Sequence, residues 1–199
     1  MRILIIGATG TIGRAVTALF ADHHEVLRAG RNSGELKVDA KDPASVHAMF
    51  EQAGPLDAVV MTAGGVHVGP LGEMTPEQFQ LGLNDKLMGQ VNVVLAGQRY
   101  LRDGGSFTLT SGIVAQQPIR QGVGMMATNR AIEGFVQSAA CELPRGQRIN
   151  VVSPSVLTES WEGYGPYFPG FEPVTAARTA LGYQRSVEGV ENGQIYRVW

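Results

Sequence analysis

The chain has 199 residues, a formal net charge of −2 and 17% charged residues. This low charge excludes a nucleic-acid binder that relies on a dense basic surface, and a long disordered tail would need more charge and fewer aliphatic residues. A chain of this length buries roughly 70% of its unfolded surface, so we expect one domain over residues 1–199 that needs no disulfide or metal. Glycine is the outlier: its 26 residues of 199 are about 13% of the chain, against an average share of roughly 7%.

The single cysteine, Cys141, forms neither an intrachain disulfide nor a zinc cluster, which indicates a reducing compartment. Because it falls on the apolar side of a predicted helix, we expect its thiol to be buried. No apolar run approaches the roughly 20 residues of a membrane span, and residues 1–6 are too short for a signal-peptide core. We therefore expect a cytoplasmic protein with no membrane or nucleic-acid partner.

Short apolar runs alternate with segments of helical period, which predicts βαβ units and a parallel sheet. The first helical stripe consists of Ile12, Ala15, Val16, Leu19 and Phe20, at spacings that share one helix face. Too few residues separate the second and third predicted strands for a helix to form between them. The predicted strands cover residues 2–6, 25–29, 36–38, 58–61, 106–110, 148–152 and 194–198.

The later helices have recognisable ends. Thr75, Pro76 and Gln78 mark a helix start, with a hydroxyl N-cap, a proline in the first turn and a glutamine able to reach back. The longest helix is predicted over residues 122–143 and the last over about residues 175–187. Between the helix start at Thr75 and the longest helix, a further apolar stripe is formed by Leu87, Val91, Val94 and Leu95.

Residues 154–173 hold five aromatic residues, four prolines and three glycines. This composition predicts an ordered loop or lid rather than a linker, and no internal repeat or domain boundary is visible elsewhere.

A glycine-rich turn, with Gly7, Gly10 and Gly13, joins the first strand to the first helix. Glycine permits a tight turn and a close approach of the backbone to a pyrophosphate, while the helix N-terminus presents unpaired N–H groups to the anion. The position between a strand and an amphipathic helix therefore predicts dinucleotide binding. Glycine needed only for packing is the alternative.

The segment after the second strand contains arginine where an NAD site usually has a carboxylate for the ribose 2′-hydroxyl. Residues 27–33 read Leu-Arg-Ala-Gly-Arg-Asn-Ser, which favours NADP over NAD. Alternatively, Arg28 and Arg31 are ordinary solvated charges, because 13 of the 16 basic residues are arginine.

Several motifs in order resemble the short-chain dehydrogenase/reductase family over essentially the whole chain. They are the glycine turn, Asp39, Met61-Thr-Ala-Gly64 where the family has Asn-Asn-Ala-Gly, Thr110-Ser-Gly112, residues 127–135 and residues 148–154. The resemblance implies an α/β fold, a doubly wound parallel sheet of about seven strands of the Rossmann type, with NAD(P) across the carboxyl ends of the strands. The chain looks like an abbreviated and divergent member, because it lacks the helix between strands two and three.

The resemblance also implies which positions meet the cofactor. The glycine turn and the segment after the second strand face the pyrophosphate and adenosine half, and the segment after the sixth strand faces the nicotinamide. The implied cofactor-binding residues are Gly7, Thr9, Gly10, Thr11, Ile12, Gly13, Arg31, Asn32, Ser33, Asp39, Ala40, Ala63, Gly64, Pro154 and Leu157.

The catalytic residues of the family do not carry over. Family members reduce carbonyls or oxidise alcohols with a Tyr-x-x-x-Lys pair, a serine and an asparagine, in which the tyrosine transfers the proton. By alignment Met125 replaces the tyrosine, Asn129 the lysine and Lys86 the asparagine, with Asn84 as a register alternative. Ser111 matches the serine, 14 residues before Met125, if the loop tolerates a slip of one residue.

We therefore take Ser111, Lys86 and Asn129 as the catalytic candidates. The Lys86 ammonium would partly replace the missing charge; the alternative is an ordinary exposed lysine. Met125, His67 and Tyr164 are expected to line the substrate site, and a neutral histidine acts as acid or base near pH 7. Aromatic filler beneath a loop is the alternative for Tyr164.

The leading hypothesis is an NADP-binding oxidoreductase that acts on a small carbonyl or alcohol with non-standard proton-transfer residues and no metal. The alternative is a non-catalytic sensor of the NADP(H) redox state, which the Met125 and Asn129 pair favours. A third hypothesis is a structural subunit that assembles through its longest helix. The family resemblance implies a homodimer or homotetramer.

Overall fold

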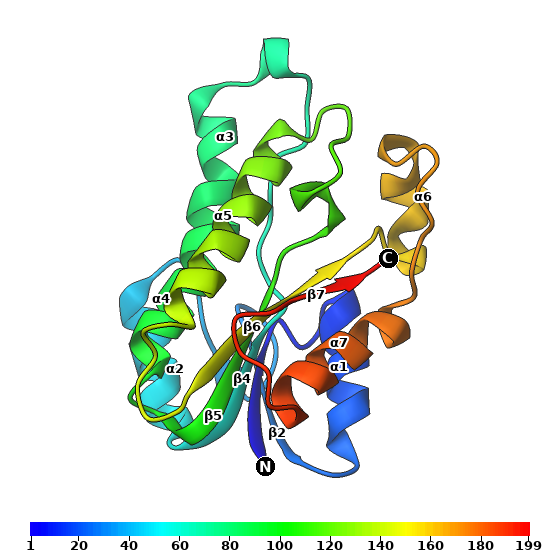
Figure 1. Cartoon of the computed structure of the whole chain (residues 1–199). Helices are drawn as coiled ribbons and strands as arrows, with labels where there is room; N and C mark the ends of the chain where they lie inside the picture. The colour runs from blue at the N-terminus through cyan, green and yellow to red at the C-terminus, as the bar shows by residue number, and fades with distance from the viewer.

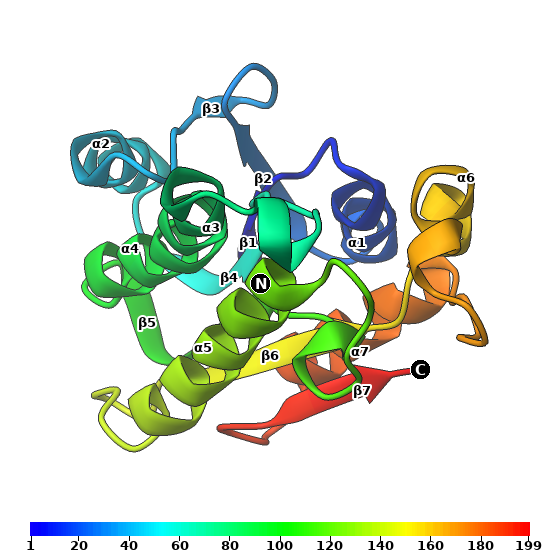
Figure 2. The same ribbon diagram turned by 90° about the horizontal axis from the view of Figure 1, so that it is seen from above.

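The computed structural model describes residues 1–199 and contains one seven-stranded sheet in the order β3-β2-β1-β4-β5-β6-β7, with every adjacent pair parallel (Figures 1 and 2). The doubly wound α/β prediction is confirmed, because the strand order reverses at β1. The strands are β1 Arg2–Ile6, β2 Glu25–Gly30, β3 Leu36–Lys37, β4 Leu56–Met61, β5 Leu101–Thr110, β6 Arg148–Pro154 and β7 Ile195–Val198.

Helices cover both faces of the sheet, as Figure 2 shows from above. Side chains of α2, α4 and α5 share one buried cluster with the sheet, and those of α1 and α7 share another. The principal helices are α1 Thr11–Ala21, α2 Pro43–Ala53, α3 Pro76–Gly82, α4 Met88–Gly97, α5 Val123–Ala139, α6 Trp161–Tyr164 and α7 Ala176–Glu188. No helix is both long and apolar enough to cross a bilayer.

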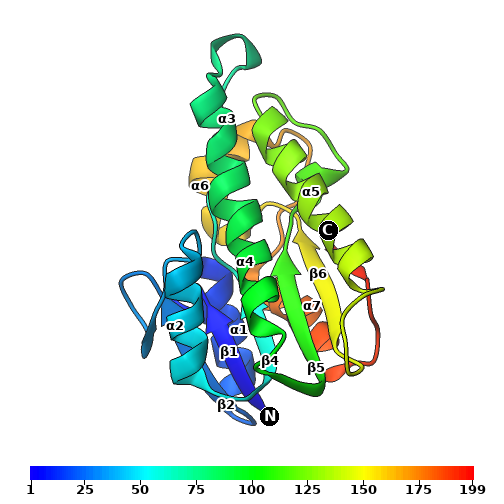
Figure 3. The same ribbon diagram turned by 90° about the vertical axis from the view of Figure 1, so that its left-hand side faces the viewer.

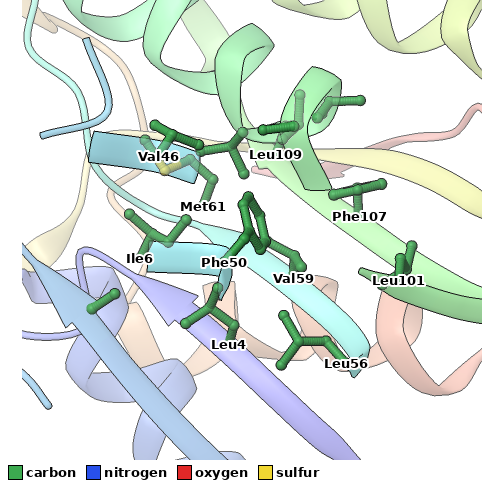
Figure 4. Packing of buried hydrophobic residues seen from close by; sticks show 14 of the residues in the cluster. Leu4, Ile6, Val46, Phe50, Leu56, Val59, Met61, Leu101, Phe107 and Leu109 are labelled. Carbon is green, nitrogen blue, oxygen red and sulfur yellow. The ribbon is translucent and has the colours of Figure 1, made fainter. Parts of the chain in front are cut away.

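The larger cluster forms around Phe50 of α2, which lies against Leu4 of β1 and Val59 of β4 in Figure 4. All three side chains are fully buried or nearly so. No helix was predicted over residues 43–53, although Asp42 accepts a hydrogen bond from Ala44 N–H as an N-cap and Pro43 occupies the first turn. The missed helix follows β3, so the predicted absence of a helix between β2 and β3 holds.

Two predicted burial patterns are wrong. Leu95 was placed on the apolar stripe of α4, yet its side chain is 57% exposed, while Val93 is buried. Cys141 is exposed rather than buried, because α5 ends at Ala139 and the chain turns before the thiol can continue the apolar face.

The elements that carry the candidate site rise above the carboxyl ends of the strands. Figure 3 shows α3 and α4 as one continuous helix, joined through the π-helical turn η2 Leu83–Leu87. The predicted lid consists of short turns, η4 Thr158–Ser160, α6 and η5 Gly165–Tyr167. Phe168 of this segment is buried against Ile113 and Val114 of η3 Ile113–Ala115.

Candidate functional site

The turn between β1 and α1 is packed so tightly that two of its positions admit no side chain. Gly7 adopts a φ of +85°, and a Cβ atom there would lie 2.9 Å from Ala63 Cβ. A Cβ atom on Gly13 would lie 2.1 Å from the Gly7 carbonyl oxygen. The glycines therefore bring the start of α1, with its unpaired N–H groups, directly against the carboxyl ends of β1 and β4.

A cleft of about 380 Å³ opens beside this turn, where the strand order reverses between β1 and β4. Ligands of open α/β sheets bind at this kind of switch point. Eight predicted cofactor residues line it, together with Ile6, Gly30, Val38, Met61 and Asp85. The eight are Gly7, Thr9, Arg31, Asn32, Ser33, Ala40, Ala63 and Gly64.

The remaining cofactor candidates lie behind or beyond this cleft. Gly10, Thr11, Ile12 and Gly13 belong to the turn and the start of α1. Pro154 ends β6, where it pairs with Val198, and Leu157 bridges to Val174. Neither Pro154 nor Leu157 lines the cleft.

The two arginines after β2 have different surroundings. Arg28 forms an ion pair with Glu35, whose pKa its guanidinium lowers to about 2. Arg31 is 58% exposed at the cleft, 3.6 Å from Asp39 and 3.9 Å from Asp85. These separations exceed normal hydrogen-bond lengths, so the Arg31 guanidinium keeps its donors available to an anionic ligand, whereas two nitrogens of the Arg28 guanidinium already donate to Glu35.

Lys86 lies on the π-helical turn at the edge of the cleft, and π-turns are frequent at functional sites. A Cβ atom on the cleft residue Gly64 would lie 2.8 Å from Lys86 Cα, so the two backbones are in close contact. The Lys86 ammonium donates to Asn129 Oδ1 at 2.8 Å and to the Ser111 carbonyl at 3.0 Å. Burial lowers the pKa of Lys86 to about 8.

Asn129 is buried on α5, one turn after Met125. Met125 packs with the apolar lid cluster around Ile113 and Phe168 and offers no proton. Asn84, the register alternative to Lys86, is exposed. Lys86 and Asn129, two of the predicted catalytic residues, thus contact each other through their side chains.

Ser111 lies at the predicted strand end, but its hydroxyl is buried and donates to Glu133 Oε1 at 2.9 Å. Gln116 donates to the other oxygen of the Glu133 carboxylate. A Cβ atom on Gly112 would instead lie 3.3 Å from Asn129 Nδ2. Gly112, which carries no hydroxyl, thus borders Asn129, and Ser111 contributes its carbonyl to Lys86. In the sequence, Ser111 lies 14 residues before Met125, one residue more than the match to the family's serine requires. This extra residue was the sequence signal that the Ser111 hydroxyl would not face Asn129.

The other candidates are more dispersed. His67 is partly buried in the segment after β4, and its carbonyl lies near Gly124 at the start of α5. Tyr164 is 48% exposed on α6 and does not line the cleft.

Sequence reasoning missed two polar residues next to this site, Gln90 and Glu133, which are 0% and 2% exposed. Each lies four positions after a candidate, Gln90 after Lys86 and Glu133 after Asn129. A polar residue one turn from a candidate, within an otherwise apolar stripe, was the signal that could have found them.

Comparisons with known proteins agree with this fold. A short-chain dehydrogenase family model described as enoyl-(acyl carrier protein) reductase matches residues 8–196. The crystal structure of the protein lin1944 from Listeria innocua is 47% identical, with a TM-score of 0.98 and full coverage of both chains. A small-chain dehydrogenase solved in complex with NADPH is 27% identical, with a TM-score of 0.89 over 100% of this chain and 96% of that one.

Among curated proteins, tetrahydroxynaphthalene reductase PfmaG of Pestalotiopsis fici is 32% identical over 155 residues, which is 73% of this chain and 56% of the relative. The aligned part thus spans little more than half the length of that relative. The chain belongs to the short-chain dehydrogenase/reductase family of oxidoreductases.

Proposed function

We propose that the protein is an NADP-dependent oxidoreductase that interconverts a small carbonyl compound and its alcohol, with Lys86 in place of a tyrosine as the proton-transfer residue. The observation that carries this proposal is the Lys86 ammonium, held at the edge of the cleft by Asn129 and the Ser111 carbonyl. The relatives named as reductases and the neighbour solved with NADPH support it.

The cleft fits a dinucleotide on structural grounds. Gly7 lines the cleft, and the close packing at Gly7 and Gly13 sets the start of α1 beside it. Arg31, Asn32 and Ser33 would hold the adenosine half, with the Arg31 guanidinium on the 2′-phosphate. When bound, NADP supplies or accepts a hydride at its nicotinamide ring.

The proton would come from Lys86. An ammonium has three N–H donors, and the two observed hydrogen bonds leave one for a ligand. With its pKa lowered to about 8, Lys86 is charged at neutral pH and close enough to its pKa to exchange a proton. The residue can thus protonate a developing alkoxide in one direction and, as the neutral amine, accept the alcohol proton in the other.

A non-catalytic NADP(H) sensor is the second candidate function. The observation in its favour is Met125, which packs an apolar side chain into the lid cluster at the position of the family's tyrosine. A sensor would bind NADP(H) with high affinity and show no turnover that depends on Lys86.

We further propose a cytoplasmic location and assembly as a homodimer or homotetramer. The exposed Leu95 on α4 and a cavity of about 240 Å³ between α4 and α5, lined by Phe135 and Leu143, support contact between copies. Light scattering after size exclusion would measure the assembly, and a monomer would refute that part.

The deciding experiment combines binding with turnover. NADPH binding is measured by titration calorimetry, and NADPH oxidation is followed by absorbance with a panel of small ketones, aldehydes and quinones. The proposal expects NADPH binding by the wild type and by Lys86→Met, with turnover about 10²- to 10⁴-fold lower in the variant. Binding without any Lys86-dependent turnover would favour the sensor, and no binding would overturn both candidates.

A further inference from the structure

Gln90 of α4 is fully buried, and its side-chain amide contacts the backbone of β5 at one residue. Its Oε1 atom accepts from Thr110 N–H at 2.8 Å, and its Nε2 atom donates to the Thr110 carbonyl at 3.0 Å. A side-chain amide that meets both backbone groups of one residue imitates a neighbouring strand. Gln90 does not line the cofactor cleft, so contact with the cofactor does not explain this arrangement.

The amide fills a gap in the sheet. The registered pairing of β4 with β5 ends at Val60 and Thr108, so β4 offers no backbone partner to Thr110 N–H and C=O. On the other side β6 continues, and Ser111 N–H donates to Val152 O at 2.9 Å. Buried backbone groups are almost always paired, and here Gln90 supplies the partner that a strand would otherwise provide.

Ser111, the residue directly after β5, carries the acceptor for Lys86. The Ser111 carbonyl accepts from Lys86 Nζ, and the Ser111 hydroxyl donates to Glu133. Lys86 and Gln90 lie one turn apart on the same continuous helix. This helix therefore holds the end of β5 through Gln90 and brings the Lys86 ammonium to the Ser111 carbonyl. Glu133 on α5 also holds Ser111, because its carboxylate accepts the hydrogen bond from the Ser111 hydroxyl.

We propose that Gln90 is a positioning residue for Lys86: by holding Thr110, it fixes the Ser111 carbonyl as a hydrogen-bond acceptor for the ammonium. The catalytic meaning of this arrangement rests on the proposed function, but the arrangement itself does not. If the carbonyl turns away, the ammonium loses one of its two acceptors, and the charged form of Lys86 becomes less stable.

Other charges near Lys86 would remain unchanged when Gln90 is replaced. On its own turn lies Asp85, which accepts from Gly65 N–H at 3.0 Å and faces Arg31. From α5 the carboxylate of Glu133 accepts a hydrogen bond from the Ser111 hydroxyl. A shift in the Lys86 titration would therefore report the position of the carbonyl rather than a change in charge.

The test is an NMR titration of lysine side chains labelled with ¹³C and ¹⁵N. The chain has only three lysines, Lys37, Lys41 and Lys86, so Lys37→Arg and Lys41→Arg assign the signals. Replacing Gln90 by methionine keeps the side-chain volume and removes both hydrogen bonds. We expect Gln90→Met to lower the measured pKa of Lys86 by about one unit, since the charged form loses one hydrogen bond.

Gln147 provides a matched control at the opposite end of β5. It is also a buried glutamine, and its Nε2 atom donates to the carbonyls of Gln98 and Leu101. Gln147→Met should lower stability in the same way without moving the Lys86 titration. Equal shifts in both variants, or no shift in Gln90→Met, would overturn the proposal.

If Gln90→Met does not fold, Gln90→Asn carries the same expectation, because its amide is one methylene too short to reach both Thr110 atoms. The titration needs neither NADP nor turnover. A shifted Lys86 pKa in a protein whose turnover ignores Lys86→Met would refute the proposed function and leave the positioning role intact. If turnover depends on Lys86 but Gln90→Met leaves the Lys86 pKa unshifted, the positioning role is refuted and the proposed function stands.

Discussion

Lys86 and Asn129 hold each other across two helices, with 2.8 Å between Nζ and Oδ1. In the family pattern the helix of Lys86 carries the asparagine and the helix of Asn129 carries the lysine. In this chain the hydrogen bond forms a lysine–amide contact beside the end of β5. The positive charge is thus retained, although it enters the site from η2 rather than from α5.

The first prediction concerns the proton donor. Lys86→Met should reduce turnover about 10²- to 10⁴-fold, which is the usual contribution of a positioned proton-transfer group. NADPH affinity should change far less, because Lys86 does not line the cleft directly. Lys41→Met, on an exposed lysine, is the matched control. Turnover that survives Lys86→Met would assign the proton to another group.

The second prediction concerns pH. Because burial lowers the pKa of Lys86 to about 8, the ammonium is present below pH 8 and is lost as the pH rises through it. Carbonyl reduction should therefore fall above about pH 8, and alcohol oxidation, which needs the neutral amine, should rise over the same range. Pre-steady-state rates from pH 6 to 10 would measure this inflection. Parallel profiles in the two directions would contradict it.

The third prediction concerns the choice of cofactor. NADPH should bind at least tenfold tighter than NADH, a ratio that one charge-assisted contact with phosphate can supply. Arg31→Ala should remove most of the preference, as measured by titration calorimetry. Arg28→Ala is the control, because Glu35 already occupies that guanidinium. Equal affinities of the wild type for the two cofactors would refute the role of Arg31.

The fourth prediction concerns the glycine turn. Gly13→Ala should lower the free energy of unfolding by about 1–3 kcal/mol, since a Cβ atom would overlap the Gly7 carbonyl. The variant should also lose NADPH binding. Gly134→Ala, on the exposed side of α5 with no atom within 4 Å of the new Cβ, should instead stabilise the helix by roughly 0.5–1 kcal/mol. Chemical denaturation would measure both changes.

Local sequence rules predicted the sheet well because strand and helix periods are properties of short segments. All seven strands were found, although β5 begins at Leu101 rather than at residue 106. The helix α2 was missed because its apolar residues alternate with polar ones less regularly than those of α1, so its capping by Asp42 was the clearer signal. Leu95 was misplaced because Val93 and Gln90 take the buried side of α4.

The doubly wound fold and the tight glycine turn at Gly7 and Gly13 could be predicted from the sequence alone, and so could the alignment of Met125 with the family's tyrosine. These follow from residue types at fixed spacings along one element. Only the tertiary structure decided that Lys86 meets Asn129 and that the Ser111 hydroxyl turns toward Glu133. Hydrogen bonds between elements depend on how helices pack against strand ends, and a shift of one residue along a strand turns a side chain to the opposite face.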